Sequence, residues 1–338
     1  MIQKKVILFV LLLSSLTCSL LSYTKLDKAT LRATMYMTSG ISYMQASSIL
    51  KEEGKQETQV RAVFYQKSVV EEIDADILEI YGDARLLTRG MEALAEEDVA
   101  GCLISEGLAL ELFKSIKVQG NQVIAGEKTY TVRGVYKETD KQLIRLNRDE
   151  EVAFYQVRIQ KQENKTATVT LQEFATRHGL TGTTLQWIEY VGVVKGMLLL
   201  AFAMLAILLW YEIVREIIDE IALKMKNTSK RSALQIHDYR KIMKRIYIGI
   251  VLVLLFLQVY IPTEMIPSTW SDFTYWESWF QSMSKNIGNV LTLDKIGYEQ
   301  DFLKQGAYAI VGSLGVIVLS LFLVEKAKKT HKIMHKMY

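Results

Sequence analysis

The chain has 338 residues, half of them hydrophobic, and a formal net charge of +4. This hydrophobic fraction is ordinary for a soluble protein, but here the apolar residues gather in four blocks that contain no formal charge. The long segment 23–189 carries 21 lysine and arginine residues against 25 acidic residues. It lacks the basic surface of a nucleic-acid-binding domain, so we expect no nucleic-acid partner.

Each apolar block is near the length of about 17–25 residues that a helix needs to cross the hydrocarbon core of a bilayer. The blocks are Val6–Ser22, Gly196–Tyr211, Ile246–Ile261 and Ala307–Val324. Because soluble helices rarely lack a polar face, we predict four transmembrane helices rather than buried core helices. The first block also fits a signal peptide with a cleavage site near Thr17, or lipidation at Cys18, but an uncleaved helix is favoured.

Lysine and arginine counts set the orientation, because these residues concentrate in cytoplasmic segments. Nine lie in 212–245, five follow the fourth block, and two lie in the N-terminal segment, whereas 262–305 has three. Both termini are therefore predicted to be cytoplasmic, in a multi-pass protein of the cell membrane. The lipid bilayer is accordingly one expected partner.

The predicted fold is an α-helical membrane protein with four transmembrane helices and a mixed α+β extracytoplasmic domain between helices 1 and 2. The predicted parts are transmembrane helices at 1–23, 188–211, 246–261 and 306–325, the extracytoplasmic domain at 24–187, a cytoplasmic loop at 212–245, an extracytoplasmic loop at 262–305 and a basic tail at 326–338.

The extracytoplasmic domain is predicted to begin with a helix over Thr24–Glu53 that continues from the membrane and stops at Gly54. Alternating apolar residues then predict strands at 60–64, 77–81 and 154–160, and a hairpin over 122–136.

Two further helices in this domain are predicted from their caps. Ser105 is a good N-cap for the short helix Ser105–Phe113, and Thr170–Glu173 has the pattern of a capping box that opens a helix ending at His178 and Gly179.

An amphipathic helix with an aromatic face is predicted between the third and fourth blocks. Its apolar residues recur every three to four positions: Trp270, Phe273, Trp276, Phe280, Met283 and Ile287. Trp270, Phe273, Trp276 and Phe280 are the candidate membrane-interface residues, since aromatic side chains favour the headgroup level. Packing of the same face on the membrane bundle or on the extracytoplasmic domain is an equal alternative.

Sequence motifs for common chemistries are absent. The chain has no GxxxxGK[ST], GxSxG, HExxH or CxxC, so we expect no enzyme, no catalytic residues and no cofactor. His331 and His335 have helical spacing for a metal, but no acidic or thiol partner lies near them in the basic tail, so no metal site is expected. His178 and His237 are expected to be solvated.

The apolar blocks hold no Asp, Glu or Arg, which argues against an ion-coupled carrier.

The order of one helix, a large outer domain and three more helices resembles the MacB/FtsX-type ABC transporter permeases. Two stretches resemble the periplasmic core pattern of that family. One runs from Leu86 through Glu97-Asp98 to Cys102–Glu106 and Leu112-Phe113, and the other is Val123–Val135. The resemblance covers about 86–137 well, and the rest through topology. The resemblance implies a permease-type subunit that transmits ATPase-driven motion to an extracytoplasmic domain. It also implies a separate ATP-binding subunit as partner, and assembly of the permease subunit as a homo- or heterodimer in the membrane.

The loop 212–245 departs from this family, because the glycines and the Arg-Arg-Ala core of its usual ATPase-docking stretch are missing. Ile213–Met225 is predicted to continue the second membrane helix. Ser232 and Gln235 then form a capping-box pattern for a short helix with Leu234 and Tyr239 on its apolar surface. These four residues are the candidate ATPase-coupling residues; the alternative is a basic loop held at anionic headgroups.

Three hypotheses therefore remain from the sequence. The first is the permease-type subunit. The second is a motorless membrane-anchored binding or scaffold protein that uses the same outer domain. The third, a membrane enzyme, has no catalytic constellation in its favour.

Overall fold

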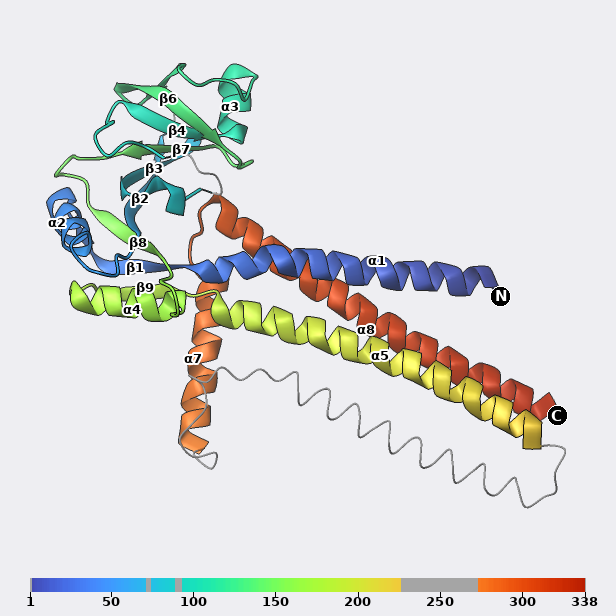
Figure 1. Ribbon diagram of the computed structural model, residues 1–338. Helices are drawn as coiled ribbons and strands as arrows, with labels where there is room; N and C mark the ends of the chain where they lie inside the picture. Colours follow the sequence, from blue (N-terminus) through green and yellow to red (C-terminus); the bar gives the residue numbers. More distant parts are fainter. Residues whose placement is uncertain (1, 71–73, 89–92, 226–272, 338) are drawn as a thin grey trace. The chain divides into compact units, whose positions relative to one another are not determined.

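The computed structural model describes residues 2–70, 74–88, 93–225 and 273–337. These residues form two compact units (Figure 1). One unit consists of Asp27–Tyr190 together with Ser278–Lys304, and we call it the sheet domain. The other contains the described parts of Met1–Leu26, Val191–Glu277 and Gln305–Tyr338, and we call it the helical unit.

Nine strands within the described residues form one mixed sheet in the sheet domain, in the order β5-β6-β4-β7-β3-β2-β8-β1-β9. The pairs β3–β7 and β4–β6 are parallel and the others are antiparallel. The strands are β1 Arg32–Ile41, β2 Ala62–Val70, β3 Ala75–Gly82, β4 Gly101–Ser105, β5 Gln122–Ala125, β6 Lys128–Tyr136, β7 Gln142–Leu146, β8 Phe154–Gln160 and β9 Gly182–Leu185.

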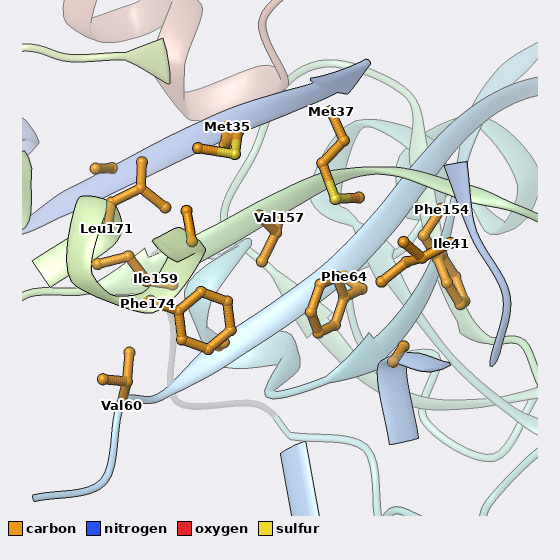
Figure 2. Close-up of a cluster of buried hydrophobic side chains, with 14 of the residues drawn as sticks. Met35, Met37, Ile41, Val60, Phe64, Phe154, Val157, Ile159, Leu171 and Phe174 are labelled. Atoms are coloured by element: carbon orange, nitrogen blue, oxygen red, sulfur yellow. The ribbon is translucent and has the colours of Figure 1, made fainter. Parts of the chain in front are cut away.

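Helices of the sheet domain cover one face of this sheet. They are α2 Tyr43–Glu53, α3 Glu106–Phe113 and α4 Ala167–Arg177. Short 3-10 turns lie at η1 Asp27–Leu31 and η3 Ala84–Leu86, and η3 packs into the cluster on the opposite face. Figure 2 shows the apolar core under α2 and α4, where Phe64 and Phe174 pack with their ring centroids 6.4 Å apart. A second apolar cluster on the same face includes Leu108 and Ala109 of α3.

The opposite face of the sheet carries a third cluster. Because neighbouring residues in a strand point to opposite faces, Val63 and Tyr65 of β2 lie on this side while Phe64 lies under α4. The cluster is completed by residues far along the chain, Ile296 and Tyr298. The segment Ser278–Lys304 is therefore part of the sheet domain, which the sequence did not assign to it.

Several sequence predictions are confirmed. The predicted hairpin is β5–β6, with Val123 opposite Tyr130 and Gly126 at φ +66 in its turn. The Ser105 hydroxyl accepts a hydrogen bond from the Leu108 amide, so Ser105 is the N-cap of α3 as expected. The strand 154–160 is β8, and α4 ends at His178 and Gly179.

The predicted helix over Thr24–Glu53 is wrong for its middle part. Within that range α1 ends at Leu26, the 3-10 turn η1 follows, and Arg32–Ile41 is strand β1. The α-helix resumes only at Tyr43–Glu53 and ends at Gly54 as expected. The apolar residues Ala33, Met35 and Met37 recur at every second position and are all buried in the core under α4. Ala33 and Met37 also stand four apart, which is why the same residues fitted a helical period.

The predicted capping box at Thr170 is also wrong. Helix α4 begins one turn earlier, and its N-cap is Thr166, which accepts a hydrogen bond from the Val169 amide at 3.3 Å. Thr170 lies inside the helix, buried, and donates to the Thr166 carbonyl oxygen at 2.9 Å. The true N-cap has Val169 three residues later and so lacks the Glu or Gln of a capping box, whereas Thr170 has Glu173 at that spacing.

The helical unit contains α1 Ile2–Leu26, most of α5 Ile188–Met225 and most of α8 Gly297–Met337, while α7 Phe273–Thr292 begins in it and ends in the sheet domain. Among the residues that the structure describes, two helices are long and apolar enough to cross a membrane, over Ile188–Ala206 and Gly297–Leu323. Helix α5 runs on to Met225, as predicted. The predicted third membrane helix at 246–261 lies outside the described residues.

Helices α1 and α8 approach closely inside the helical unit. The Ser19 hydroxyl oxygen lies 2.7 Å from that of Ser313 and 2.8 Å from the Ala309 carbonyl oxygen. A Cβ added at Gly312 would stand 2.9 Å from the Ser15 carbonyl oxygen. Only a residue without a side chain therefore permits this backbone approach.

Candidate functional site

The site is the place where the start of α8 is built into the sheet domain. The chain leaves α7 at Thr292, crosses the sheet face opposite α2 and α4, and enters α8 at Gly297. Ile296 and Tyr298 are buried there, at 4% and 3% exposure. The first turn of a helix with a membrane-type composition is therefore also part of a domain core.

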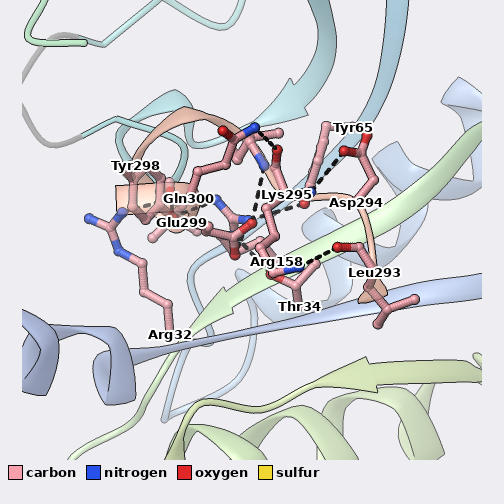
Figure 3. Close-up of polar contacts among 12 residues, drawn as sticks. Arg32, Thr34, Tyr65, Arg158, Leu293, Asp294, Lys295, Tyr298, Glu299 and Gln300 are labelled. Carbon is pink, nitrogen blue, oxygen red and sulfur yellow. Dashed lines mark hydrogen bonds and ion pairs between the residues drawn. The ribbon is translucent and has the colours of Figure 1, made fainter. Parts of the chain in front are cut away.

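Arg158 of β8 is the centre of the site and is fully buried (Figure 3). Its guanidinium donates to the Thr34 hydroxyl at 2.9 Å, the Tyr298 hydroxyl at 2.5 Å and the Tyr65 hydroxyl at 3.2 Å. It also forms an ion pair with Glu299 at 2.6 Å. A guanidinium offers five N–H donors, so these four partners use most of its capacity and make its burial tolerable.

The Glu299 carboxylate has two partners, one in the sheet and one at the start of its own helix. One carboxylate oxygen pairs with Arg158, and the other accepts from the Ile296 amide at 3.4 Å. Ile296 directly precedes α8, so this second contact satisfies one of the free amides at the start of the helix, as the acid in a capping box does. A carboxylate in the first turn also suits the positive end of the helix dipole.

Tyrosine rings complete the surroundings of the charged pair. The guanidinium carbon of Arg158 lies 5.4 Å from the ring centre of Tyr65 and 5.2 Å from that of Tyr298, within the range of cation–π attraction. The Tyr298 hydroxyl donates to the Leu86 carbonyl oxygen at 3.0 Å, and Arg32 donates to the same oxygen at 2.9 Å. Tyr298 thus connects Arg158 to the end of η3.

The linker between α7 and α8 is tied to the sheet as well. The Tyr36 hydroxyl donates to the Asp294 carbonyl oxygen, and Lys67 lies 3.6 Å from the Asp294 carboxylate and 3.1 Å from Asp76. Lys295 is buried and donates to the Leu293 carbonyl oxygen. Contacts from two strands, β1 and β2, therefore fix this linker in addition to the ion pair.

The protonation states follow from burial and from the neighbouring charges. Burial alone would lower the pKa of Arg158, but Glu299 and the surrounding tyrosines raise it further than burial lowers it, so Arg158 stays charged. Burial raises the pKa of Tyr65 and of Tyr36, so both hydroxyls stay protonated and can donate. Burial lowers the pKa of Lys295. Arg158 is thus a buried positive charge that faces the Glu299 side chain at 2.6 Å.

This arrangement is suited to holding parts together rather than to chemistry on a substrate. The two central charged groups, those of Arg158 and Glu299, have protein partners and are closed to solvent. Among the described residues no group of three or more His, Cys, Asp or Glu side chains could hold a metal ion. Cys102 is buried, and burial raises the pKa of its thiol to about 12, so it is a poor nucleophile at neutral pH.

The site residues proposed from sequence lie elsewhere. Ser232, Leu234, Gln235, Tyr239 and Trp270 fall outside the described residues, so their roles stay predictions. Phe273, Trp276 and Phe280 lie on α7, which is helical as predicted.

The structure tests the expectation for His178, whereas His237 lies outside the described residues. His178 is not solvated: its side chain is 4% exposed and its Nε2 lies 2.8 Å from the buried carboxylate of Glu53, because the end of α4 packs against the end of α2. His331 and His335 lie on the last turns of α8.

Sequence reasoning missed Arg158, Tyr298 and Glu299. In the alternation of β8, Val157 and Ile159 mark the buried face, so Arg158 between them reads as solvent-facing. The one signal was the run Tyr298-Glu299 just before the fourth apolar block, where an aromatic and an acid stand at the start of a helix.

No protein-family model matches the chain, and no curated protein matches it. Among solved structures, it is similar to the periplasmic region of MacB from Actinobacillus actinomycetemcomitans, at 15% identity and a TM-score of 0.36, over 47% of this chain and 90% of that one. It is also similar to the extracellular domain of the noncanonic ABC-type transporter YknZ from Gram-positive bacteria, at 15% identity and a TM-score of 0.33, over 45% of this chain and 96% of that one. About half of this chain lies in each match.

Proposed function

We propose that this protein is the permease-type membrane subunit of an ABC transporter, in which α8 transmits ATPase-driven motion to the extracytoplasmic sheet domain. The observation that carries the proposal is the buried ion pair between Arg158 of the sheet and Glu299 in the first turn of α8. It joins a membrane-type helix to a folded domain at a point where neither can shift without leaving a charge unpaired.

The length of the apolar part of α8 agrees with this role. Its candidate span Gly297–Leu323 has 27 residues, which at the usual helical rise corresponds to about 40 Å. A bilayer core is about 30 Å thick, so roughly two turns remain outside it. Those are the turns of Gly297–Lys304, which belong to the sheet domain.

The residues that resemble the MacB/FtsX-type permeases support the same function. Strand β4, helix α3 and the hairpin β5–β6 are neighbours in the sheet domain, with β4 parallel to β6 and α3 sharing a core with both. The resemblance thus belongs to one connected piece of the fold rather than to scattered positions.

The remaining parts of the proposal follow from the sequence. Lysine and arginine counts favour a multi-pass protein of the cell membrane with both termini in the cytoplasm. The chain itself would carry out no catalysis; a separate ATP-binding subunit would supply hydrolysis by docking at Leu234 and Tyr239. A homo- or heterodimer in the membrane is the expected assembly.

The proposal is tested by purifying the full chain from its native membranes in the presence of ATP. An ATP-binding subunit should co-purify with the wild type, and the pair of changes Leu234→Asp and Tyr239→Asp should abolish this without preventing membrane insertion. Hydrogen exchange of β8 amides should change on ATP addition in the wild type. In Glu299→Gln the ATPase should still bind, but this change should be lost.

A motorless scaffold is the second candidate, favoured by the departure of loop 212–245 from the family's docking stretch. It predicts that no ATP-binding subunit co-purifies with the wild type. That result would remove the transport proposal and leave the scaffold.

A further inference from the structure

Helix α7 presents a line of large apolar side chains that the described residues do not cover. Phe273, Phe280 and Leu291 are 82%, 60% and 57% exposed. They are separated by 7 and 11 residues, which brings all three to nearly the same side of a helix with 3.6 residues per turn. Exposed apolar area of this kind, arranged in a line, marks a contact surface.

The other side of α7 is fixed to the sheet domain. The Asn286 side chain donates to the Glu189 carboxylate at 2.8 Å, and that of Asn289 donates to the Thr184 carbonyl oxygen at 3.3 Å. Val290 is fully buried. Since Asn286 and Asn289 lie about 120° and about 180° around the helix from Phe280, the apolar line points away from these contacts with the domain.

These contacts also place the end of α7 beside the start of a membrane-type helix within the sheet domain. Glu189 is in the first turn of α5, whose candidate membrane span begins at Ile188. Beyond Thr292 the chain needs only four residues to reach Gly297, where the candidate span of α8 begins. The end of α7 therefore lies where two membrane-type helices leave the sheet domain.

We propose that α7 is an interfacial helix whose line of Phe273, Phe280 and Leu291 inserts into the outer leaflet, at the boundary of headgroups and acyl chains. Phenylalanine and leucine on one side, with Ser282 and Lys285 exposed on another, are the composition of a helix that lies in this boundary. The inference rests on the membrane anchoring in the proposed function and does not need the ATPase.

The test measures lipid contact at single positions of the full chain. Cys18 and Cys102 are replaced by alanine, and cysteine is introduced at Phe280, Leu291, Ser282 or Val318 and labelled with an environment-sensitive fluorophore. Each protein is reconstituted into phosphatidylcholine vesicles that contain a lipid spin-labelled near the top of its acyl chain. Ser282 is the matched control on the opposite side of α7, and Val318, 62% exposed on α8, reports membrane insertion.

We expect strong quenching at Phe280, Leu291 and Val318 and weak quenching at Ser282. Quenching at Val318 with none at Phe280 and Leu291 would overturn this inference alone and would indicate that a protein covers the line. Equal quenching at Phe280 and Ser282 would also overturn it, because an interfacial helix exposes only one side to lipid. No quenching at Val318 would remove the membrane anchoring on which it rests.

Discussion

Helix α8 is held in two regions by different chemistry. In the sheet domain its first turns are fixed by a buried charge pair, with Glu299 against Arg158 and the Tyr298 ring beside it. In the helical unit it meets α1 through small and hydroxylic residues, with Ser313 against Ser19 and Gly312 against Ser15. The same helix is thus anchored once by charge and once by close backbone approach.

The proposed membrane anchoring of the helical unit explains the difference. In a domain folded in water, burial of a charged pair is costly unless every partner is in place, so the pair stabilises one arrangement and penalises all others. Between helices in lipid there is little hydrophobic driving force, since the lipid tails are as apolar as leucine. Small residues then allow van der Waals contact, and hydroxyls add weak hydrogen bonds.

The largest expected effect comes from breaking the charged anchor. Glu299→Gln keeps the shape of the side chain but leaves Arg158 buried without a counter-charge, which should cost about 3–5 kcal/mol of domain stability. Hydrogen exchange of the β8 amides in the full chain in detergent micelles measures this loss. Lys304→Gln, at an exposed position of the same helix, is the control and should change stability by no more than about 0.5 kcal/mol. A Glu299→Gln protein as stable as this control would contradict the role of the pair.

A smaller effect is expected from the anchor in the helical unit. Gly312→Leu forces a side chain into the backbone contact with Ser15 and should cost about 1–3 kcal/mol of helix packing. In a chain with Cys18 replaced by alanine, cysteines at Ser19 and Ser313 should cross-link on oxidation, and Gly312→Leu should abolish the cross-link. Val311→Leu, at a 67% exposed neighbour, should leave it intact. Equal yields in both variants would mean that α1 and α8 do not touch here.

The smallest effect distinguishes a buried charge from a surface charge. Asp83 pairs with Arg61 and Arg85 at the domain surface; burial alone would raise its pKa, but the two arginines hold the pKa below its usual value. Asp83→Asn should therefore cost only about 0.5–1 kcal/mol at neutral pH. Because the folded-state pKa is lowered, the contribution is present above the unfolded pKa of about 4 and is lost as the pH falls through the folded value. The wild type and the variant should therefore converge in acid; a gap that stays constant with pH would show that charge is not the cause.

The sequence correctly predicts the parts of the fold that short-range patterns determine. Alternation located β8 and the hairpin β5–β6, and the Ser105 hydroxyl gave the start of α3. It failed at β1, where a spacing of four residues between Ala33 and Met37 suits a helix and a strand equally well.

The candidate site could not be predicted from the sequence, for a related reason. Arg158 and Tyr298 stand 140 residues apart, and no local period records that a charged side chain on β8 will be covered by the start of a distant helix. The burial of Arg158 depends on partners from β1, β2 and α8 at once. Only the assembled sheet brings these residues together.

The central claim, that the charged pair fixes α8 to the sheet, is tested most directly by a double-mutant cycle in the full chain. Arg158→Met and Glu299→Met are made singly and together, and the free energy of opening is measured by hydrogen exchange of the β8 amides. Each single change should cost about 3–5 kcal/mol, while the double change should be close to the wild type because no buried charge remains. The account predicts a coupling energy of at least about 2 kcal/mol, and single effects that add to within about 0.5 kcal/mol would contradict it.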